Sequence, residues 1–228
     1  FLLAEEIIPE RSAYIEAFVL AGAGLTAGFF FSAAAGAALC LLLILSGWLY
    51  NYPPAVWKGR PLMGLVTNGF SGLIIYSLGW FTAGGGINLL HGAAYTAAGG
   101  AVYLNTTIPD RRGDGETGKI TFGVRYGLRN TAAAALFLEV LTLVLAVLSR
   151  DTLLAIPAAV MLPFFIYAAI RPHKREIGFA TKISVLALAA AVCIVFPLYL
   201  VPVFIVFFGS KLYYKKRFNL NYPSFKKE

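Results

Sequence analysis

Seven long apolar runs constrain the fold of this chain more than any other feature of its sequence. A span of roughly 20 apolar residues crosses the ~30 Å hydrocarbon layer of a membrane as a helix. The runs are continuous and rich in Leu, Ala and Gly, whereas the strands of a membrane β-barrel alternate with a period of two. They cover residues 13–31, 33–50, 62–81, 88–108, 124–148, 153–170 and 183–208.

The composition of the chain also indicates a membrane environment. With 59% hydrophobic residues, 13% charged residues and a mean hydropathy of +0.74, the 228 residues have more apolar surface than a soluble domain could bury. Only helices and closed barrels satisfy their own backbone groups in lipid. We therefore predict an all-α, polytopic membrane bundle that forms a single domain over residues 1–228.

Two local patterns inside the runs predict how the helices pack and bend. Small residues at 21–24 and 97–100 let neighbouring backbones approach closely. The longest run contains Pro197 and Pro202, and a proline removes a helical hydrogen bond and clashes with the preceding turn. We expect a kink in this run or a helix broken in two.

The distribution of Lys and Arg predicts the orientation, because these residues accumulate on the cytoplasmic side. With the polar loop around Asp110 in the cytoplasm, seven spans place 12 of the 19 basic residues on that side and seven on the other. Six of those seven belong to the C-terminal tail. Either the tail lies on the far surface, which we prefer, or the proline-broken run returns it to the cytoplasm. We expect the plasma membrane as the location.

The basic residues also indicate the kind of partner. The net charge is +8, and the cations flank the spans instead of forming one solvated face. This arrangement suits contact with anionic membrane lipid and argues against nucleic acid.

The first residues of the chain have an unusual pattern. Phe1 is not an initiator residue, and residues 1–4 read like the stump of an apolar helix that abuts the polar stretch 5–11. We expect residues to be missing before Phe1 or between Ala4 and Glu5.

The polar loop 105–121, NTTIPDRRGDGETGKIT, contains the residues that favour a chemical function. Asp110 and Asp114 are four residues apart, so on a helix end both carboxylates share one face. A pair of hard oxygen ligands suits Mg²⁺, which commonly bridges one or two carboxylates to substrate phosphates. The alternative is an ordinary solvated loop in which the aspartates cap helices.

Glycines and cations around the two aspartates favour a diphosphate as the ligand. Glycines in this loop permit a close approach of the backbone to an anion, and Lys119, Arg111 and Arg112 supply countercharge. Arg111 and Arg112 also suit a simpler role as cytoplasmic anchors, which needs only their position at the end of a span.

These residues resemble a known family. The run 110–127, DRRGDGETGKITFGVRYG, resembles the second aspartate-rich motif of the UbiA superfamily of intramembrane polyprenyl transferases. The segment 50–61, YNYPPAVWKGRP, resembles the Tyr/Pro/Lys/Arg loop that the family has two helices earlier. The resemblance extends over nearly the whole chain, and it matches the seven runs to helices three to nine of a nine-helix fold.

The chain departs from the family in one motif. The first motif of the family, NxxxDxxxD, has no counterpart, because no Asn is followed by Asp at four and eight residues. We expect this motif and the first two helices to precede Glu5. A degenerate, inactive relative is the alternative.

The resemblance implies roles for individual residues. Asp110 and Asp114 are the expected ligands of Mg²⁺ and, with Lys119, the expected catalytic residues. Lys58 and Arg60 are the expected contacts of the diphosphate, since fixed cations aimed at developing negative charge lower the barrier.

Three further polar residues have two interpretations each. Tyr50 and Tyr52 face the allylic cation through their rings, or they belong to the aromatic belt of the membrane interface. Asn68, ~9 Å along its span, contacts the diphosphate or the acceptor, or it bonds to a neighbouring helix.

The expected function is therefore Mg²⁺-dependent transfer of a polyprenyl group from its diphosphate to a lipophilic or aromatic acceptor, in the biosynthesis of quinones, ether lipids or related lipids. A non-catalytic binder or transporter of isoprenoid diphosphates is the alternative. A cation transporter needs acidic groups near the bilayer midplane, and only Glu139 meets that condition.

Overall fold

The computed structural model describes residues 8–86 and 88–220, and its regular elements are helices. The expected discontinuity within residues 1–7 lies outside the described residues. The α-helices are α1 Glu10–Phe31, α2 Ala33–Leu42, α3 Pro61–Thr82, α4 Leu89–Thr106, α5 Arg111–Glu116, α6 Phe122–Leu148, α7 Thr152–Ile170, α8 Lys174–Val195 and α9 Leu200–Phe218. The η elements are the π-helix η1 Leu43–Leu49 and the 3₁₀-helices η2 Trp57–Gly59 and η3 Pro197–Tyr199.

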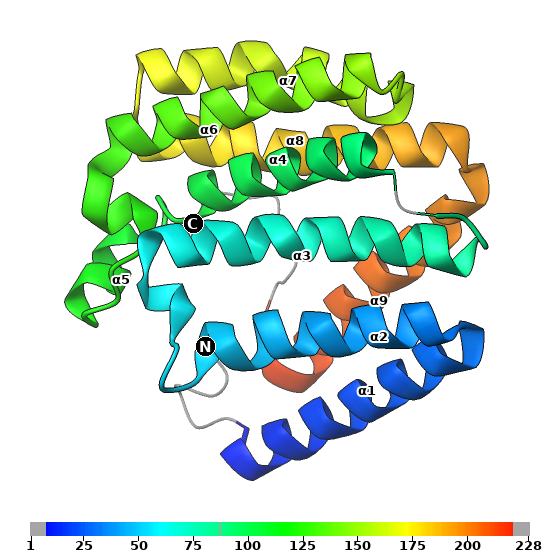
Figure 1. Cartoon of the computed structure of the whole chain (residues 1–228). Helices are drawn as coiled ribbons and strands as arrows, with labels where there is room; N and C mark the ends of the chain where they lie inside the picture. Colours follow the sequence, from blue (N-terminus) through cyan, green and yellow to red (C-terminus); the bar gives the residue numbers. More distant parts are fainter. Residues whose placement is uncertain (1–7, 87, 221–228) are drawn as a thin grey trace.

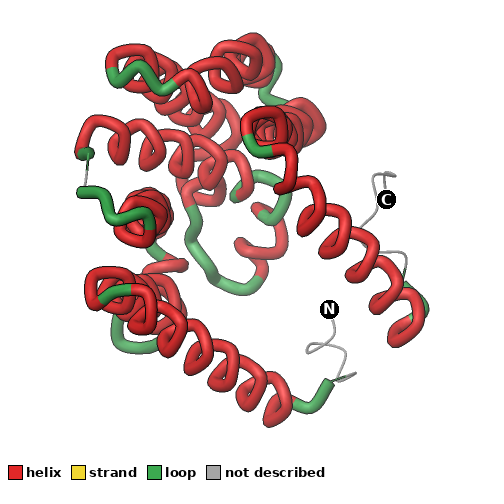
Figure 2. The backbone as a smooth tube through the Cα atoms, turned by 90° about the vertical axis from the view of Figure 1, so that its right-hand side faces the viewer, coloured by secondary structure: helices red, strands yellow, loops and turns green. Residues whose placement is uncertain are grey.

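The predicted all-α membrane bundle is confirmed, but the number of long spans differs from the predicted seven. Six segments are long and apolar enough to cross a membrane by length and composition, namely α1, α3, α6, α7, α8 and Pro197–Phe218, and Ala33–Leu49 is a shorter apolar segment. Successive helices pack as antiparallel neighbours, with α4 between α3 and α6 and with α7 against both α6 and α8 (Figures 1 and 2). The short α5 lies at one end of this bundle, which we call the loop end.

Helix α4 is the most deeply buried element, and small residues explain why it can occupy that position. Its buried residues include Gly92, Ala94, Ala97, Gly100 and Ala101. Because these side chains add little volume, the helices α3 and α6 approach its backbone closely. The predicted packing role of the small residues is thus confirmed at 97–100. It is wrong at 21–24, where nothing in the described structure lies within 4 Å of a Cβ built on Gly22 or Gly24.

Helices α1 and α2 form a hairpin with a turn of one residue. Ser32 is extended, and its hydroxyl accepts a hydrogen bond from the amide of Ala35 at 3.0 Å, which caps α2. Gly28 and Gly36 face each other where the two helices approach, and a Cβ on Gly28 would lie 3.3 Å from the Cα of Gly36. The two helices therefore pack backbone to backbone next to the turn.

The predicted break at the prolines is confirmed, and it shows that the predicted bounds of the last span are wrong. The run 183–208 is not one span, because α8 ends at Val195 and the chain turns at Pro197 into η3 and α9. Helix α8 also begins at Lys174, so Lys182 lies within α8 and not in the preceding loop.

The break changes the expected course of the tail. Helix α9 runs back in the direction of the loop end (Figure 1). This course matches the alternative in which the proline-broken run returns the C-terminal tail to the side of the Asp110 loop. Its only extensive contact among the described residues is with η3, and none of its residues is buried. Its surface is therefore available to lipid.

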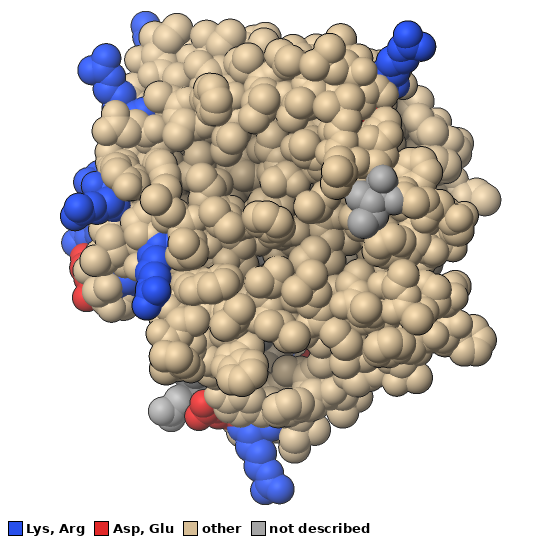
Figure 3. All heavy atoms as spheres, in the orientation of Figure 1, with Lys and Arg blue, Asp and Glu red and all other residues tan. Residues whose placement is uncertain are grey.

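Charged side chains gather at the loop end. Figure 3 shows Lys and Arg concentrated at the left edge of the molecule, over the end that carries α5, with a broad uncharged surface beside them. This surface includes exposed Phe, Leu, Ile and Val side chains on most helices. The pattern matches a helical bundle whose sides face lipid and whose ends face the headgroups.

Candidate functional site

The predicted placement of the two aspartates on a helix end is confirmed. Asp110 is the N-cap residue of α5, and Asp114 lies one turn later, where its amide donates to the carbonyl of Asp110 at 2.8 Å. The side chain of Asp110 makes no capping hydrogen bond and is exposed. The aspartates are therefore not used mainly as helix caps, and the two carboxylates share one turn of α5.

A reversal of the chain at Gly118 brings Lys119 back to Asp114. The amide of Gly118 donates to the carbonyl of Gly115 at 3.2 Å, and the amide of Lys119 donates to the carbonyl of Asp114 at 2.8 Å. This pair of hydrogen bonds is the Schellman motif, which needs a left-handed residue after the helix. Gly118 supplies it with φ +74°, a value that costs glycine little.

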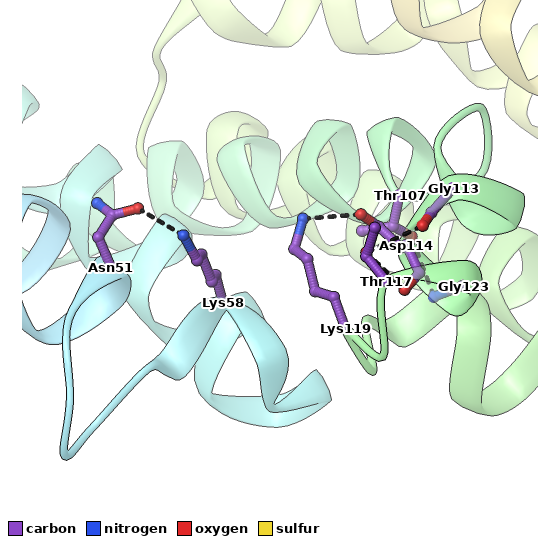
Figure 4. Close-up of polar contacts among 8 residues, drawn as sticks. All are labelled: Asn51, Lys58, Thr107, Gly113, Asp114, Thr117, Lys119 and Gly123. Atoms are coloured by element: carbon purple, nitrogen blue, oxygen red, sulfur yellow. Dashed lines mark hydrogen bonds and ion pairs between the residues drawn. The ribbon is translucent and has the colours of Figure 1, made fainter. Parts of the chain in front are cut away.

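The side chain of Lys119 completes this link. Its Nζ lies 3.0 Å from Oδ1 of Asp114 in an ion pair in which the Asp114 side chain is 13% exposed and the Lys119 side chain 35% (Figure 4). Partial burial reduces screening by water and makes such a pair stronger than a surface pair. Lys119 and Asp114, which the sequence selected separately, are therefore held together as one unit.

A close contact between α4 and α6 fixes the base of the loop. The amide of Gly123 donates to the hydroxyl of Thr107 at 3.1 Å. A Cβ on Gly123 would lie 2.8 Å from the carbonyl oxygen of Thr107, so only glycine fits this approach. The two ends of the loop that carries Asp110, Asp114 and Lys119 are thus held side by side.

The second predicted loop lies at the same end of the bundle. Lys58 is in η2, and its Nζ donates to Oδ1 of Asn51 at 3.4 Å, while Asn51 itself donates to the carbonyls of Ser46 and Gly47. Figure 4 shows the side chains of Lys58 and Lys119 extending in the same direction from the two loops. Arg60 is the N-cap residue of α3, where its side chain makes no capping hydrogen bond and is exposed.

Tyr103 of α4 connects the two loops, and the sequence analysis did not select it. Its hydroxyl interacts with the side chains of Tyr50 and Asp114, and it lies so close to α3 that a Cβ on Gly64 would overlap it. Asn68 is one turn further along α3 and donates to the carbonyl of Gly64 at 2.8 Å. A large polar residue just beyond the small residues 97–101 is the signal that could have identified Tyr103.

Other candidate residues lie elsewhere. Tyr52 is 47% exposed and interacts with Tyr14 of α1. Glu139 is buried within α6, in the membrane part of the bundle. Arg111 and Arg112 do not contact Asp114, and instead they line a groove on another face of α5.

The described residues include no group of three or more His, Cys, Asp or Glu side chains that could hold a metal ion. Asp110 and Asp114 are two carboxylates on one turn, which matches the ligand set that Mg²⁺ takes when substrate phosphates and water supply the remaining oxygens. The donor atoms thus fit a metal that binds together with a diphosphate.

The fold and this site define a class: a polytopic α-helical membrane protein with an aspartate and lysine cluster at one end of the bundle. The particular family follows from sequence. The UbiA prenyltransferase family matches residues 2–178, so the chain belongs to this family of intramembrane prenyltransferases. No match was found among curated proteins.

Solved structures share the fold. A UbiA homolog from Archaeoglobus fulgidus superposes with a TM-score of 0.64 at 16% sequence identity, covering 83% of this chain and 74% of that chain. The same homolog bound to DMAPP and Mg2+ gives 0.62 at 16% identity, covering 83% and 71%, and its Cd2+-bound form gives 0.61 at 16%, covering 81% and 73%. The predicted family resemblance is therefore confirmed.

Proposed function

We propose that this protein transfers a prenyl group from its diphosphate to a lipophilic or aromatic acceptor in a Mg²⁺-dependent reaction. The observation that carries the proposal is the arrangement at α5, where Asp110 and Asp114 share one turn and Lys119 is paired with Asp114 at 3.0 Å. The binding of DMAPP and Mg2+ to the Archaeoglobus fulgidus homolog supports the choice of donor.

Asp110 and Asp114 would hold the metal. When bound, Mg²⁺ supplies positive charge that neutralises the departing diphosphate. Asp110 is exposed and offers its oxygens directly, whereas Asp114 is less exposed and is oriented by Lys119. Lys119 would then contribute a fixed cation close to the phosphate oxygens.

Lys58 and Arg60 would contact the diphosphate from the second loop. Fixed cations favour the ionised state, because negative charge develops on the leaving group as its bond to carbon breaks. In the transfer, the bond between the allylic carbon and the diphosphate oxygen breaks and its electron pair leaves with the diphosphate. The acceptor forms the new bond to that carbon and loses a proton to water.

Tyr50, Tyr52 and Asn68 have more limited proposed roles. Tyr50 would present its ring to the allylic cation from the position that Tyr103 fixes. Tyr52 is the weaker of the two candidates because it lies with Tyr14, and Asn68 would bind the acceptor only if it released its bond to Gly64. An apolar prenyl chain would lie among the membrane helices, in contact with lipid.

Domain extent and location complete the proposal. We retain residues 1–228 as one prenyltransferase domain, in which the first aspartate-rich motif of the family has no counterpart. In this proposal the protein lies in the plasma membrane, and its loop end faces the cytoplasm because most basic residues gather at that end.

The test is prenyl transfer by the full-length protein in lipid nanodiscs. The protein receives geranylgeranyl diphosphate, Mg²⁺ and a panel of hydroxybenzoate, naphthoate and glycerophosphate acceptors, with and without EDTA. The variant Asp110→Asn is compared with the control Asp151→Asn. The side chain of Asp151 caps α7 by accepting a hydrogen bond from the amide of Leu154 at 3.2 Å, and asparagine caps a helix equally well.

The proposal expects Mg²⁺-dependent product that Asp110→Asn removes and Asp151→Asn retains. Tight binding of the diphosphate without product from any acceptor would support the alternative of a non-catalytic binder or transporter. Product formation that resists EDTA would overturn the role of the metal.

A further inference from the structure

A groove of about 590 Å³ lies at the loop end, on a face of α5 that contains neither Asp110 nor Asp114. Arg111 and Arg112 of α5 and Lys174 at the start of α8 line it. These cations come from segments about 60 residues apart in the sequence, and the fold brings them to one groove. The groove is therefore a feature of the tertiary structure and not only of a basic stretch of chain.

The charges of the groove are only partly neutralised. Arg112 pairs with Glu116 through Nε and Oε1 at 2.9 Å, and Glu116 is the acidic residue in the lining. Within the described part of the chain, Arg111 and Lys174 have no side-chain hydrogen bond or ion pair. Both are exposed, so two cations remain free to bind an anion.

The remaining lining is apolar. Ile108, Val124 and Leu128 contribute to it, and Ile108 is almost fully buried. Inorganic phosphate would gain nothing from these side chains, whereas a molecule with a phosphate and a hydrocarbon chain would contact both parts of the groove. Guanidinium groups bind phosphate oxygens with two parallel hydrogen bonds, and basic pockets between membrane helices accommodate lipid headgroups.

We infer that this groove binds the headgroup of an anionic phospholipid, with the phosphate at Arg111 and Lys174 and the start of an acyl chain against Val124 and Leu128. The inference does not depend on the proposed prenyl transfer, because the groove and the aspartate pair use different residues. Figure 3 shows Lys and Arg gathered at the loop end beside a broad uncharged surface, an arrangement that suits lipid of the surrounding membrane as the occupant.

The test measures binding of phosphatidylglycerol and of phosphatidylcholine with identical acyl chains to the full-length detergent-solubilised protein by native mass spectrometry. The variant Arg111→Gln/Lys174→Gln is compared with Arg125→Gln/Lys182→Gln. The second variant removes the same charge from exposed residues that are outside the groove lining. Circular dichroism checks that both variants are folded.

The inference expects phosphatidylglycerol to bind more tightly than phosphatidylcholine. The groove variant should weaken phosphatidylglycerol binding at least about tenfold and the control about twofold or less, since each cation near a lipid phosphate contributes measurably. The charge-retaining variant Arg111→Lys/Lys174→Arg should keep most of the affinity.

Three results would overturn the inference. Equal weakening by both glutamine variants would show attraction to surface charge without a site. Equal binding of the two lipids would exclude recognition of the anion. Displacement of phosphatidylglycerol by millimolar inorganic phosphate would identify a site for free phosphate instead of lipid.

Discussion

Two ion pairs on the six-residue helix α5 and its following turn differ in what surrounds them. Asp114 pairs with Lys119 where the carboxylate side chain is 13% exposed, whereas Arg112 pairs with Glu116 where the side chains are 92% and 64% exposed. The first pair is held by a chain reversal at Gly118, and its carboxylate interacts electrostatically with the hydroxyl of Tyr103 in α4. The second has water around it.

The comparison shows that similar residues in one loop serve two different surfaces. The sequence left Arg111 and Arg112 with two roles, as countercharge beside the aspartates or as cytoplasmic anchors, and the fold separates them from Lys119. Lys119 stays with Asp114, and Arg111 and Arg112 line the groove on another face of α5. The following predictions test this separation, from the largest expected effect to the smallest.

Substitution of the acidic residues Asp114 and Glu116 should show the largest difference between the two faces of α5. Asp114→Asn removes a proposed metal ligand, so transfer should fall about thousandfold, equivalent to about 4 kcal/mol. Glu116→Gln should change transfer less than about threefold. Product formation at saturating Mg²⁺ measures both, and equal losses would show that α5 has no distinct catalytic face.

Substitution of Lys119, compared with Lys182, should have the next largest effect on prenyl transfer. Lys119→Gln removes a fixed cation from the proposed diphosphate site, so transfer should fall about hundredfold. Lys182→Gln, an exposed lysine of α8, should leave transfer within about twofold of the unchanged protein. A wild-type rate for Lys119→Gln would restrict Lys119 to a structural role.

Gly123 supports both faces through the base of the loop. Gly123→Ala places a Cβ 2.8 Å from a backbone oxygen of Thr107 that cannot move alone. The expected loss is about 1–3 kcal/mol of stability, with a midpoint of thermal unfolding about 2–10 °C lower. Gly113→Ala, which meets nothing within 4 Å, is the control and should be neutral or slightly stabilising. No difference between them would contradict the close contact.

Substitution of Tyr103 should have a smaller effect, limited to Mg²⁺ binding at the face of α5 that carries Asp110 and Asp114. Tyr103→Phe removes a hydroxyl that interacts with Asp114 and Tyr50, and one hydrogen bond within a membrane bundle contributes about 0.6 kcal/mol. The apparent affinity for Mg²⁺ in the transfer assay should fall about threefold. Tyr126→Phe on the exposed part of α6 is the control. An unchanged Mg²⁺ affinity would remove Tyr103 from the site.

The exposed ion pair should matter least. Arg112→Gln removes an i,i+4 pair that contributes about 0.3 kcal/mol at a helix surface. Thermal unfolding and transfer in neutral lipid should therefore change by less than the precision of most assays. A large loss of transfer in neutral lipid would show that the second face also takes part in the reaction.

The sequence predicted the features that depend on local pattern. Apolar runs identified the membrane helices to within a few residues at most ends, DxxxD spacing placed two carboxylates on one turn, and Pro197 identified the break between α8 and α9. Each follows from helical geometry or from the missing amide of proline.

The sequence could not predict features that depend on packing between helices. Tyr103 packs against Gly64 and interacts with Tyr50 and, electrostatically, with Asp114, residues up to 64 positions apart that no periodicity relates. The direction of α9 after the break was also open, because both courses of the tail agree with the same residues. The role of Arg111 and Arg112, as countercharge to a diphosphate or as anchors, stayed open because a sequence does not show what surrounds each face of a six-residue helix.

The single-residue turn at Ser32 has a consequence for how the protein is made. Helices α1 and α2 are joined by a turn so short, with Gly28 against Gly36, that the two helices lie side by side next to it. We therefore expect the nascent chain to insert at this point as a paired hairpin, with both of its ends on the same side of the membrane.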